Sequence, residues 1–208
     1  PTPAAAIRLA ATDAGFAQPN GTPSIAHPNQ LQSIVVRGDQ AYLPNIAAAT
    51  QGPDRFNSST MAYVNVIDNA NADGIGPDDP ADAPTKSVNL HLGARVPESG
   101  KKKLFFANPW AIAFTSQDGP GNAYVVSSGS DLLVKLDVDA TGDLTFTNGV
   151  STTRYIDLND PADPATQGRN AGKNPLGIVI RENRAFVMNY ISRNVSVVNL
   201  ATDEVEAV

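Results

Sequence analysis

Two short acidic segments have the residue types and spacing of calcium-binding loops. In the first, Asp137, Asp139 and Thr141 alternate ahead of Gly142, and Asp143 follows. Oxygen side chains at alternate positions before a glycine can surround Ca²⁺. The same residues suit an ordinary hairpin turn, in which Asp and Gly are favoured for backbone reasons. Because no Glu occupies the twelfth position of the loop, the sequence favours the turn and keeps these four oxygen side chains as candidate ligands.

The second segment has the same alternation. Asn69, Asn71 and Asp73 precede Gly74, and the twelfth position is Pro80 rather than Glu. Neutral amide ligands attract a cation less strongly than carboxylates do, so a solvated turn is favoured over a calcium site here as well.

Other residues that could perform chemistry lack the context that the chemistry needs. The only histidines, His27 and His91, belong to no cluster with metal-ligand spacing, and we expect both to lie in loops. The serines between Val125 and Asp131 have no Gly-x-Ser-x-Gly elbow, which indicates a polar turn between strands. No phosphate-binding Gly-x-x-x-x-Gly-Lys occurs. The sequence therefore predicts no catalytic residue within this chain.

Two further features have a structural and a functional interpretation. Lys101, Lys102 and Lys103 form the one basic run, which could dock an acidic redox partner but is more typical of a solvated loop tip. Trp110 follows a proline in an apolar segment and is expected to pack in the core.

Composition excludes several classes of function. The formal net charge of −6 argues against nucleic acid as a partner, because phosphate binding needs clustered Lys and Arg. No stretch of about 20 apolar residues occurs, so no membrane span is expected. The chain has no cysteine, which excludes disulfides, thiolate metal sites and covalent haem attachment within it.

Three segments of the chain repeat one pattern. Each has a proline, an apolar triplet, a polar turn and then an alanine followed by an aromatic residue, and each continues into an alternating strand that ends near Asp or Asn. The dipeptides are Ala41-Tyr42, Ala123-Tyr124 and Ala185-Phe186. Four short antiparallel strands per repeat are the plan of a propeller blade, so we expect an all-β protein with about three four-stranded blades.

The repeats are further apart than compact blades would be. Their aromatic residues stand at positions 42, 124 and 186, which gives intervals of 82 and 62 residues, whereas a compact blade takes roughly 40 to 45. We assign the excess to loop insertions rich in Pro, Asp, Asn and Gly at about 47–60, 72–103 and 157–173. The blades then occupy 26–208, and residues 1–25 are an N-terminal extension or a partial strand.

The third repeat resembles the YVTN type of β-propeller repeat. The matching residues are Asn174-Pro175, Gly177, Ile178 to Ile180, Phe186 to Asn189, Val195 to Asn199 and Ala201 to Asp203. The resemblance implies a propeller of about seven blades. Three blades cannot close, and Val208 falls where the last strand of a blade is expected to run. The expected partners are therefore the remaining blades, from the same protein or from another chain.

The stretch 190–208, together with the long Pro/Asp-rich insertions, also resembles the N-terminal propeller region of large exported bacterial proteins that continue into c-type, di-haem peroxidase-like cytochrome domains. That resemblance implies a periplasmic or extracellular location with the signal peptide removed. It also implies haem c in the remainder of a parent oxidoreductase or in a partner chain, with this chain as a non-catalytic scaffold and interaction surface. The alternatives are a lactonase-type propeller enzyme, suggested by residues 136–149, and a cell-surface or adhesion propeller.

Overall fold

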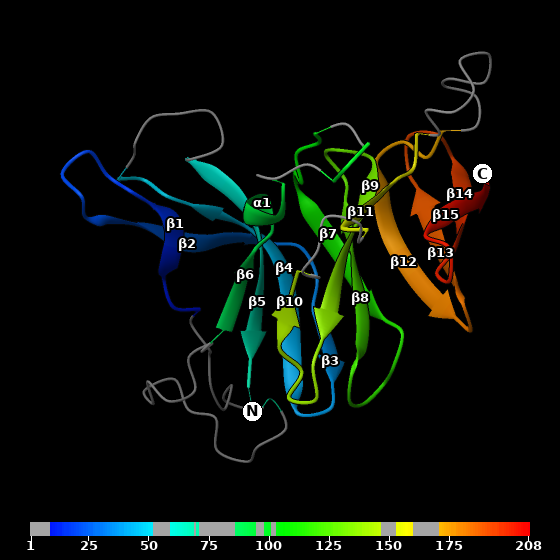
Figure 1. Ribbon diagram of the computed structural model, residues 1–208, viewed down its shortest axis with the longest axis horizontal. Coiled ribbons are helices and arrows are strands. Elements are labelled where there is room, and N and C mark those ends of the chain that lie inside the picture. The colour runs from blue at the N-terminus through cyan, green and yellow to red at the C-terminus, as the bar shows by residue number, and fades with distance from the viewer. Residues whose placement is uncertain are drawn as a thin grey trace, which may run out of the picture.

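The computed structural model describes residues 9–51, 59–68, 70, 86–94, 98–100, 103–146, 153–159 and 171–208. In these residues the chain forms three antiparallel sheets that follow one another in a row. Figure 1 shows the first sheet, blue to green, from the left to the centre, the second in green to yellow beside it, and the third in orange and red on the right. We call them blades 1, 2 and 3.

Blade 1 has six strands in the order β1-β2-β4-β5-β6, with β3 also paired to β4. The end of β2 and the short β3 border consecutive parts of β4, so together they act as the first strand of the blade. A single turn of helix follows the last strand. The elements are β1 (Thr12–Ala17), β2 (Pro23–Leu31), β3 (Val35–Arg37), β4 (Gln40–Ala48), β5 (Thr60–Ile67), β6 (Lys86–Asn89) and α1 (Leu90–Gly93).

Blade 3 is a four-stranded meander, and blade 2 has the same order with five strands. In blade 2 the outermost position is shared by two short strands, β10 and β11, which both pair with β9. The strands of blade 2 are β7 (Pro109–Phe114), β8 (Gly121–Ser127), β9 (Leu132–Val138), β10 (Leu144–Thr145) and β11 (Tyr155–Asp157). Those of blade 3 are β12 (Pro175–Arg181), β13 (Arg184–Asn189), β14 (Asn194–Asn199) and β15 (Glu204–Ala207).

The three blades share one strand register. The alanine of each Ala-aromatic dipeptide lies on the second strand and pairs with the last apolar residue of the triplet, as Ala123 does with Phe114 and Ala185 with Ile180. In blade 1, Ala41 pairs with Val36 in the same way. The predicted all-β fold with about three propeller-like blades is confirmed.

The expected insertion at 72–103 does not consist of loop alone. Strand β6 and helix α1 lie inside it, and β6 is the last strand of blade 1. Likewise, the expected N-terminal extension contains β1 and the start of β2, which form a hairpin at residues 12–26. Among the described residues, no helix has the length and apolar character needed to cross a bilayer.

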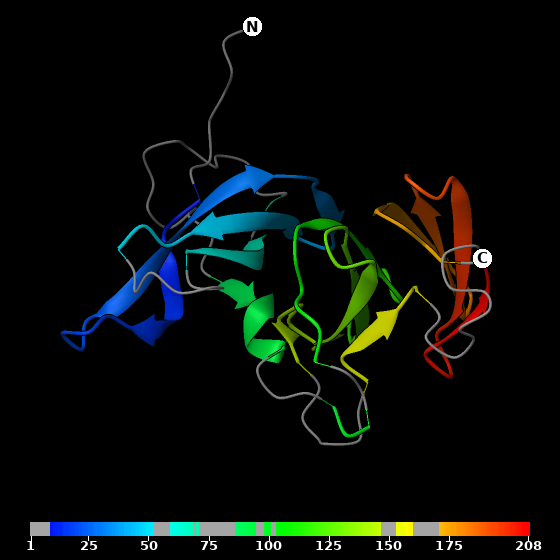
Figure 2. The ribbon, with the colours of Figure 1, turned by 90° about the horizontal axis from the view of Figure 1, so that it is seen from above.

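The core lies mainly between the blades. On each blade we call the face turned toward higher residue numbers the outgoing face and the opposite one the incoming face. The outgoing face of blade 1 packs on the incoming face of blade 2 in one buried cluster, and the outgoing face of blade 2 packs on the incoming face of blade 3 in another. Figure 2 shows the three blades from above, side by side in chain order.

Candidate functional site

The two blade interfaces share a contact made by the aromatic residue of the repeat. In blade 1, the buried hydroxyl of Tyr42 donates a hydrogen bond to the carbonyl oxygen of Gly142, at 2.8 Å, and lies 2.7 Å from Oε1 of Gln40. Gly142 belongs to the turn between β9 and β10 of blade 2. Burial raises the pKa of Tyr42 above its ordinary value, which keeps the phenol protonated as a donor.

In the second interface the equivalent residue is Tyr124. Its hydroxyl lies 3.3 Å from Oδ1 of Asp203, in the turn between β14 and β15 of blade 3. Nζ of Lys135 lies 2.7 Å from Oδ2 of the same carboxylate, and both side chains of this ion pair are less than one fifth exposed. Burial, followed by the charge of Asp203, raises the pKa of Tyr124. Each internal interface is therefore an apolar contact fixed by a polar bond to the last turn of the next blade.

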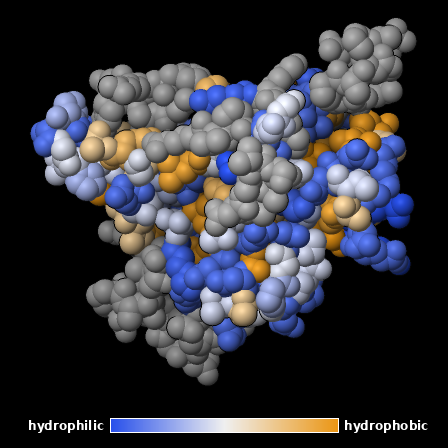
Figure 3. Space-filling model, viewed as in Figure 1, coloured by the Kyte–Doolittle hydropathy of each residue, from blue (hydrophilic) through white to orange (hydrophobic). Residues whose placement is uncertain are grey.

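The outgoing face of blade 3 has the same construction, but the described residues form no blade against it. Strand alternation places Val179, Phe186, Met188, Val195 and Val197 on this side, and we call these five residues the open face. Val179 is 59% exposed, Met188 50% and Val195 48%. Figure 3 shows hydrophobic surface in the part of the molecule where blade 3 lies.

The equivalent positions of the other two blades are buried. The register aligns Met188 and Val195 with Val126 and Leu133 of blade 2, and both of the latter are fully buried in the second interface. In blade 1 the position of Val195 is taken by Val64, which is also fully buried. The open face thus repeats a surface that the molecule covers twice elsewhere.

A charged margin borders the open face at the end where β12 turns into β13. Nε of Arg184 lies 2.7 Å from a carboxylate oxygen of Glu206, and Asn199 donates to the other oxygen at 2.8 Å. These hydrogen bonds raise the pKa of Arg184 and lower that of Glu206. An apolar centre with a polar margin is the usual composition of a protein interface.

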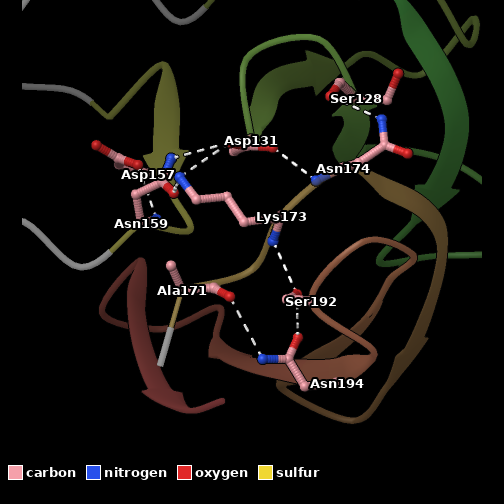
Figure 4. Close-up of polar contacts among 9 residues, drawn as sticks. All are labelled: Ser128, Asp131, Asp157, Asn159, Ala171, Lys173, Asn174, Ser192 and Asn194. Carbon is pink, nitrogen blue, oxygen red and sulfur yellow. Dashed lines mark hydrogen bonds and ion pairs between the residues drawn. The ribbon is translucent and has the colours of Figure 1, made fainter. Parts of the chain in front are cut away.

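A polar cluster joins blades 2 and 3 where the chain enters β12, at the end of their interface opposite to the contact between Tyr124 and Asp203 (Figure 4). Asp131, in the turn after β8, accepts a hydrogen bond from the backbone N–H of Asn174 at 2.7 Å and lies 3.3 Å from Nζ of Lys173. The side chain of Lys173 also contacts Asn159. Further along, the N–H of Lys173 donates to Ser192 of blade 3 at 3.0 Å. This cluster holds the connection into β12 against both blades, which is a structural role.

The four candidate calcium ligands at the β9–β10 turn are engaged with protein groups. Asp139 accepts hydrogen bonds from the hydroxyl and N–H of Thr141 and from the N–H of Asp143, and those bonds lower its pKa. Asp137 accepts from Asn122 at 2.9 Å on the neighbouring strand, and Asp143 lies 2.5 Å from Nζ of Lys86. In the described part of the chain, no group of three or more His, Asp or Glu residues could hold a metal ion. The calcium site stays a prediction.

The Asp137 contact belongs to the repeat itself. Gln40 donates to Asp68 at 2.6 Å in blade 1, as Asn122 donates to Asp137 in blade 2. In blades 1 and 2 the acidic residue near the end of the third strand thus has a structural partner on the second strand, whereas the equivalent Asn199 of blade 3 donates to Glu206. The other calcium candidates, Asn69, Asn71 and Asp73, lie outside the described residues.

The two histidines do not lie in loops, so that expectation was wrong. His27 lies on strand β2 and is exposed. His91 lies in α1, and its Nδ1 accepts a hydrogen bond from the N–H of Ala62 at 3.0 Å. Burial lowers the pKa of His91, so the neutral imidazole that this bond requires is favoured.

The remaining sequence predictions have structural outcomes. Trp110 is half-buried and packs against the cluster between blades 2 and 3, which confirms its core role. Residues 128–131 form the polar turn predicted for the serine run. Lys103 is exposed, whereas Lys101 and Lys102 lie outside the described residues.

A polar pocket of about 450 Å³ lies between blades 1 and 2, near the β3–β4 and β9–β10 turns. Its walls include Arg37 and Lys86. The Arg37 guanidinium donates to the carbonyl oxygens of Ser116 and Gly119, and Lys86 pairs with Asp143. Since Arg37 and Lys86 are both bonded to groups of blade 2, we describe the pocket as part of the interface between blades 1 and 2.

No protein-family model and no curated protein matches this sequence. Two solved structures resemble it. One is hydrazine synthase of Kuenenia stuttgartiensis, with a TM-score of 0.50 and 12% identity over 88% of this chain and 57% of that chain. The other is a functionally unknown protein of Desulfotomaculum acetoxidans, with a TM-score of 0.41 and 13% identity over 85% of this chain and 58% of that chain. This chain spans less than two thirds of either, and the first likeness shows a shared fold alone.

Proposed function

We propose that this chain is a non-catalytic β-propeller segment that serves as a scaffold and binds a further propeller blade at the open face. The observation that carries the proposal is the exposure of Met188 and Val195, whose equivalents in blade 2 are fully buried by blade 3. Burying an apolar side chain of this size stabilises an assembly by roughly 1.5–3 kcal/mol relative to leaving it in water. A contiguous exposed apolar surface with a polar margin is typical of an interaction site.

The two internal interfaces indicate the chemistry of the occupant. Between blades 2 and 3, a small and aliphatic incoming face with Ala185, Val187 and Val198 packs against the aromatic Tyr124. Between blades 1 and 2, the incoming face also presents Phe114, whose ring centroid lies 4.6 Å from that of Tyr42. A blade with an incoming face of either composition would cover Phe186 as blade 3 covers Tyr124. It could come from the same protein or from another chain.

The wider setting rests on the sequence resemblance. We propose, as that resemblance implies, an exported bacterial protein in which the propeller accompanies a haem-bearing redox domain. An absorbance spectrum from about 350 to 600 nm on the intact natural protein tests this setting, because c-type haem gives a Soret band. The docking proposal does not depend on the result.

The docking proposal is tested by comparing one substitution in two contexts. Val195→Lys should change the unfolding free energy of the 208-residue chain by less than about 0.5 kcal/mol, because the site is exposed there. In the natural protein the same substitution would bury an unpaired cation, and we expect Tm to fall by at least about 4 °C. The matched control is Asn183→Lys, at the exposed turn between β12 and β13.

The control should leave Tm unchanged in both contexts. If Val195→Lys affects the chain and the natural protein equally, nothing covers the open face and the proposal is wrong.

A further inference from the structure

The incoming face of blade 1 is buried, although none of the described residues forms a blade against it. Its upper part contains Ala47, Met61 and Tyr63, and its lower part Leu43 and Ile67, all at most 6% exposed. In blades 2 and 3 the corresponding faces are buried by the blade before them. Blade 1 must therefore be covered by some other part of the molecule.

The cover is the N-terminal segment 9–26, which contains β1 and the start of β2. Ala14 and Ala26 are fully buried in one cluster with Ala47, Met61 and Tyr63. Leu9 packs against the lower part of the face, with Leu43 and Ile67. Figures 1 and 2 show the β1–β2 hairpin at the end of the row opposite to blade 3.

Hydrogen bonds fix the hairpin to the outer strands of blade 1. The hydroxyl of Tyr63 donates to the carbonyl oxygen of Asp13 at 3.3 Å, and Asn89 donates to that of Ala14 at 3.0 Å. The hydroxyl oxygens of Thr12 and Ser87 lie 2.9 Å apart. The hairpin thus reaches β6, at the far edge of the blade.

This face differs chemically from the incoming faces of blades 2 and 3. It presents polar groups, Tyr63 and Asn89, that need acceptors when they are buried, and burial raises the pKa of Tyr63 to about 12. The backbone of the hairpin supplies those acceptors. An apolar outgoing face such as the open face of blade 3 would supply none at these positions, and unsatisfied buried donors are costly.

We infer that the array is one-ended: the hairpin at residues 9–26 stands where a preceding blade would pack, and a partner blade binds only at the open face of blade 3. The part of this inference that concerns the partner rests on the proposed function. Head-to-tail joining of two copies of the chain, with the open face of one against blade 1 of the other, is excluded by the same cover.

A cross-link between hairpin and blade tests the inference without disturbing the buried residues. Thr12→Cys with Ser87→Cys places two thiols where hydroxyl oxygens are 2.9 Å apart, in a chain that has no other cysteine. Oxidised glutathione should convert this pair to a disulfide in the 208-residue chain and in the natural protein, as judged by peptide mass spectrometry. Ala17→Cys with Ser87→Cys is the control, because Ala17 is five residues further along β1, about 16 Å away.

The oxidation of Met188 by hydrogen peroxide, measured on the same samples, separates the two proposals. A disulfide in both contexts, with Met188 protected in the natural protein, is the expected result. A disulfide that forms in the chain but not in the natural protein, with Met188 still protected, would overturn the one-ended array and leave the proposed function intact.

Two other results would also count against the inference. A disulfide in both contexts with Met188 reactive in both would contradict the proposed function, and the partner site of the one-ended array with it. Failure of the disulfide even in the 208-residue chain would contradict the position of the hairpin itself.

Discussion

The hydroxyl of Tyr42 in blade 1 donates a hydrogen bond to the carbonyl oxygen of Gly142 in blade 2, at 2.8 Å. Tyr124 makes the corresponding contact with Asp203 of blade 3. At the third equivalent position stands Phe186, which has no hydroxyl. The tyrosine contact therefore links blade 1 to blade 2 and blade 2 to blade 3. A partner at the open face of blade 3 would bind without this hydrogen bond.

Tyr42→Phe should destabilise the chain by about 1–3 kcal/mol, because it removes the buried donor and leaves the carbonyl oxygen of Gly142 unsatisfied. Urea unfolding measures the effect. Tyr190→Phe is the control, since Tyr190 is 66% exposed, and we expect a change of less than about 0.5 kcal/mol. Equal effects of the two substitutions would show that the contact between blades does not contribute.

Gly142→Ala should be among the most destabilising small substitutions. Gly142 has a φ of +82°, and an added Cβ would lie 1.7 Å from Oε1 of Gln40. The left-handed backbone costs about 1–2 kcal/mol for a residue with a Cβ, and displacing Gln40 also breaks the contact with Tyr42. Gly119→Ala separates the two causes, because Gly119 has a φ of +64° and no atom within 4 Å of the added Cβ.

In thermal unfolding, Gly142→Ala should lower Tm more than Gly119→Ala does. The same decrease for both variants would mean that only the backbone conformation matters and that the turn does not fit tightly against blade 1.

The Lys135–Asp203 ion pair should couple blades 2 and 3. A double-mutant cycle with Lys135→Met and Asp203→Asn should give a coupling energy of about 1 kcal/mol, since both side chains are largely but not completely removed from water. Arg184 and Glu206 form the comparison pair, which is more exposed. The coupling of the comparison pair should be weaker and should disappear in 0.5 M salt; the opposite order would contradict the account of the interface.

His91 should make stability depend on pH in mildly acidic solution. Its pKa is lowered in the folded chain by burial, so below about pH 6.5 the unfolded chain binds a proton that the folded chain does not. Stability should therefore fall as pH decreases from about 6.5 toward the folded-state pKa, by at most about 1.4 kcal/mol per pH unit. Above that range the contribution of His91 is fully present.

Urea unfolding at a series of pH values measures this slope. His91→Asn retains an acceptor for the N–H of Ala62 but cannot take up a proton, so the slope should decrease in this variant. An unchanged slope would assign the pH dependence to other groups.

The repeated pattern was sufficient to predict the blades because its apolar residues are those that become buried on both faces of each sheet. The Ala-aromatic dipeptide follows directly from the interfaces: Ala123 fits against blade 1, and Tyr124 reaches blade 3. The acidic turn after β9 was also visible, although its neighbours Asn122 and Lys86 lie far away in sequence.

Other parts could not be predicted from local sequence. The β1 segment, Thr12 to Ala17, is short and contains glycine, and it becomes a strand by pairing with β2, with a further hydrogen bond from the Asn89 side chain to Ala14. Strand β6 lies in a Pro/Asp-rich stretch that is typical of loops. The open face was missed because β13 alternates in the same way whether or not a neighbour covers its outer side.

The most direct test of the central claim uses the two methionines of the chain. Met188 is 50% exposed on the open face, and Met61 is 1% exposed within blade 1. Hydrogen peroxide oxidises accessible methionine to the sulfoxide, and peptide mass spectrometry gives the rate at each site. In the 208-residue chain, Met188 should oxidise much faster than Met61. In the natural protein we expect Met188 to be at least about tenfold slower and close to Met61, because a further blade covers it; the same fast rate for Met188 in both would contradict the claim.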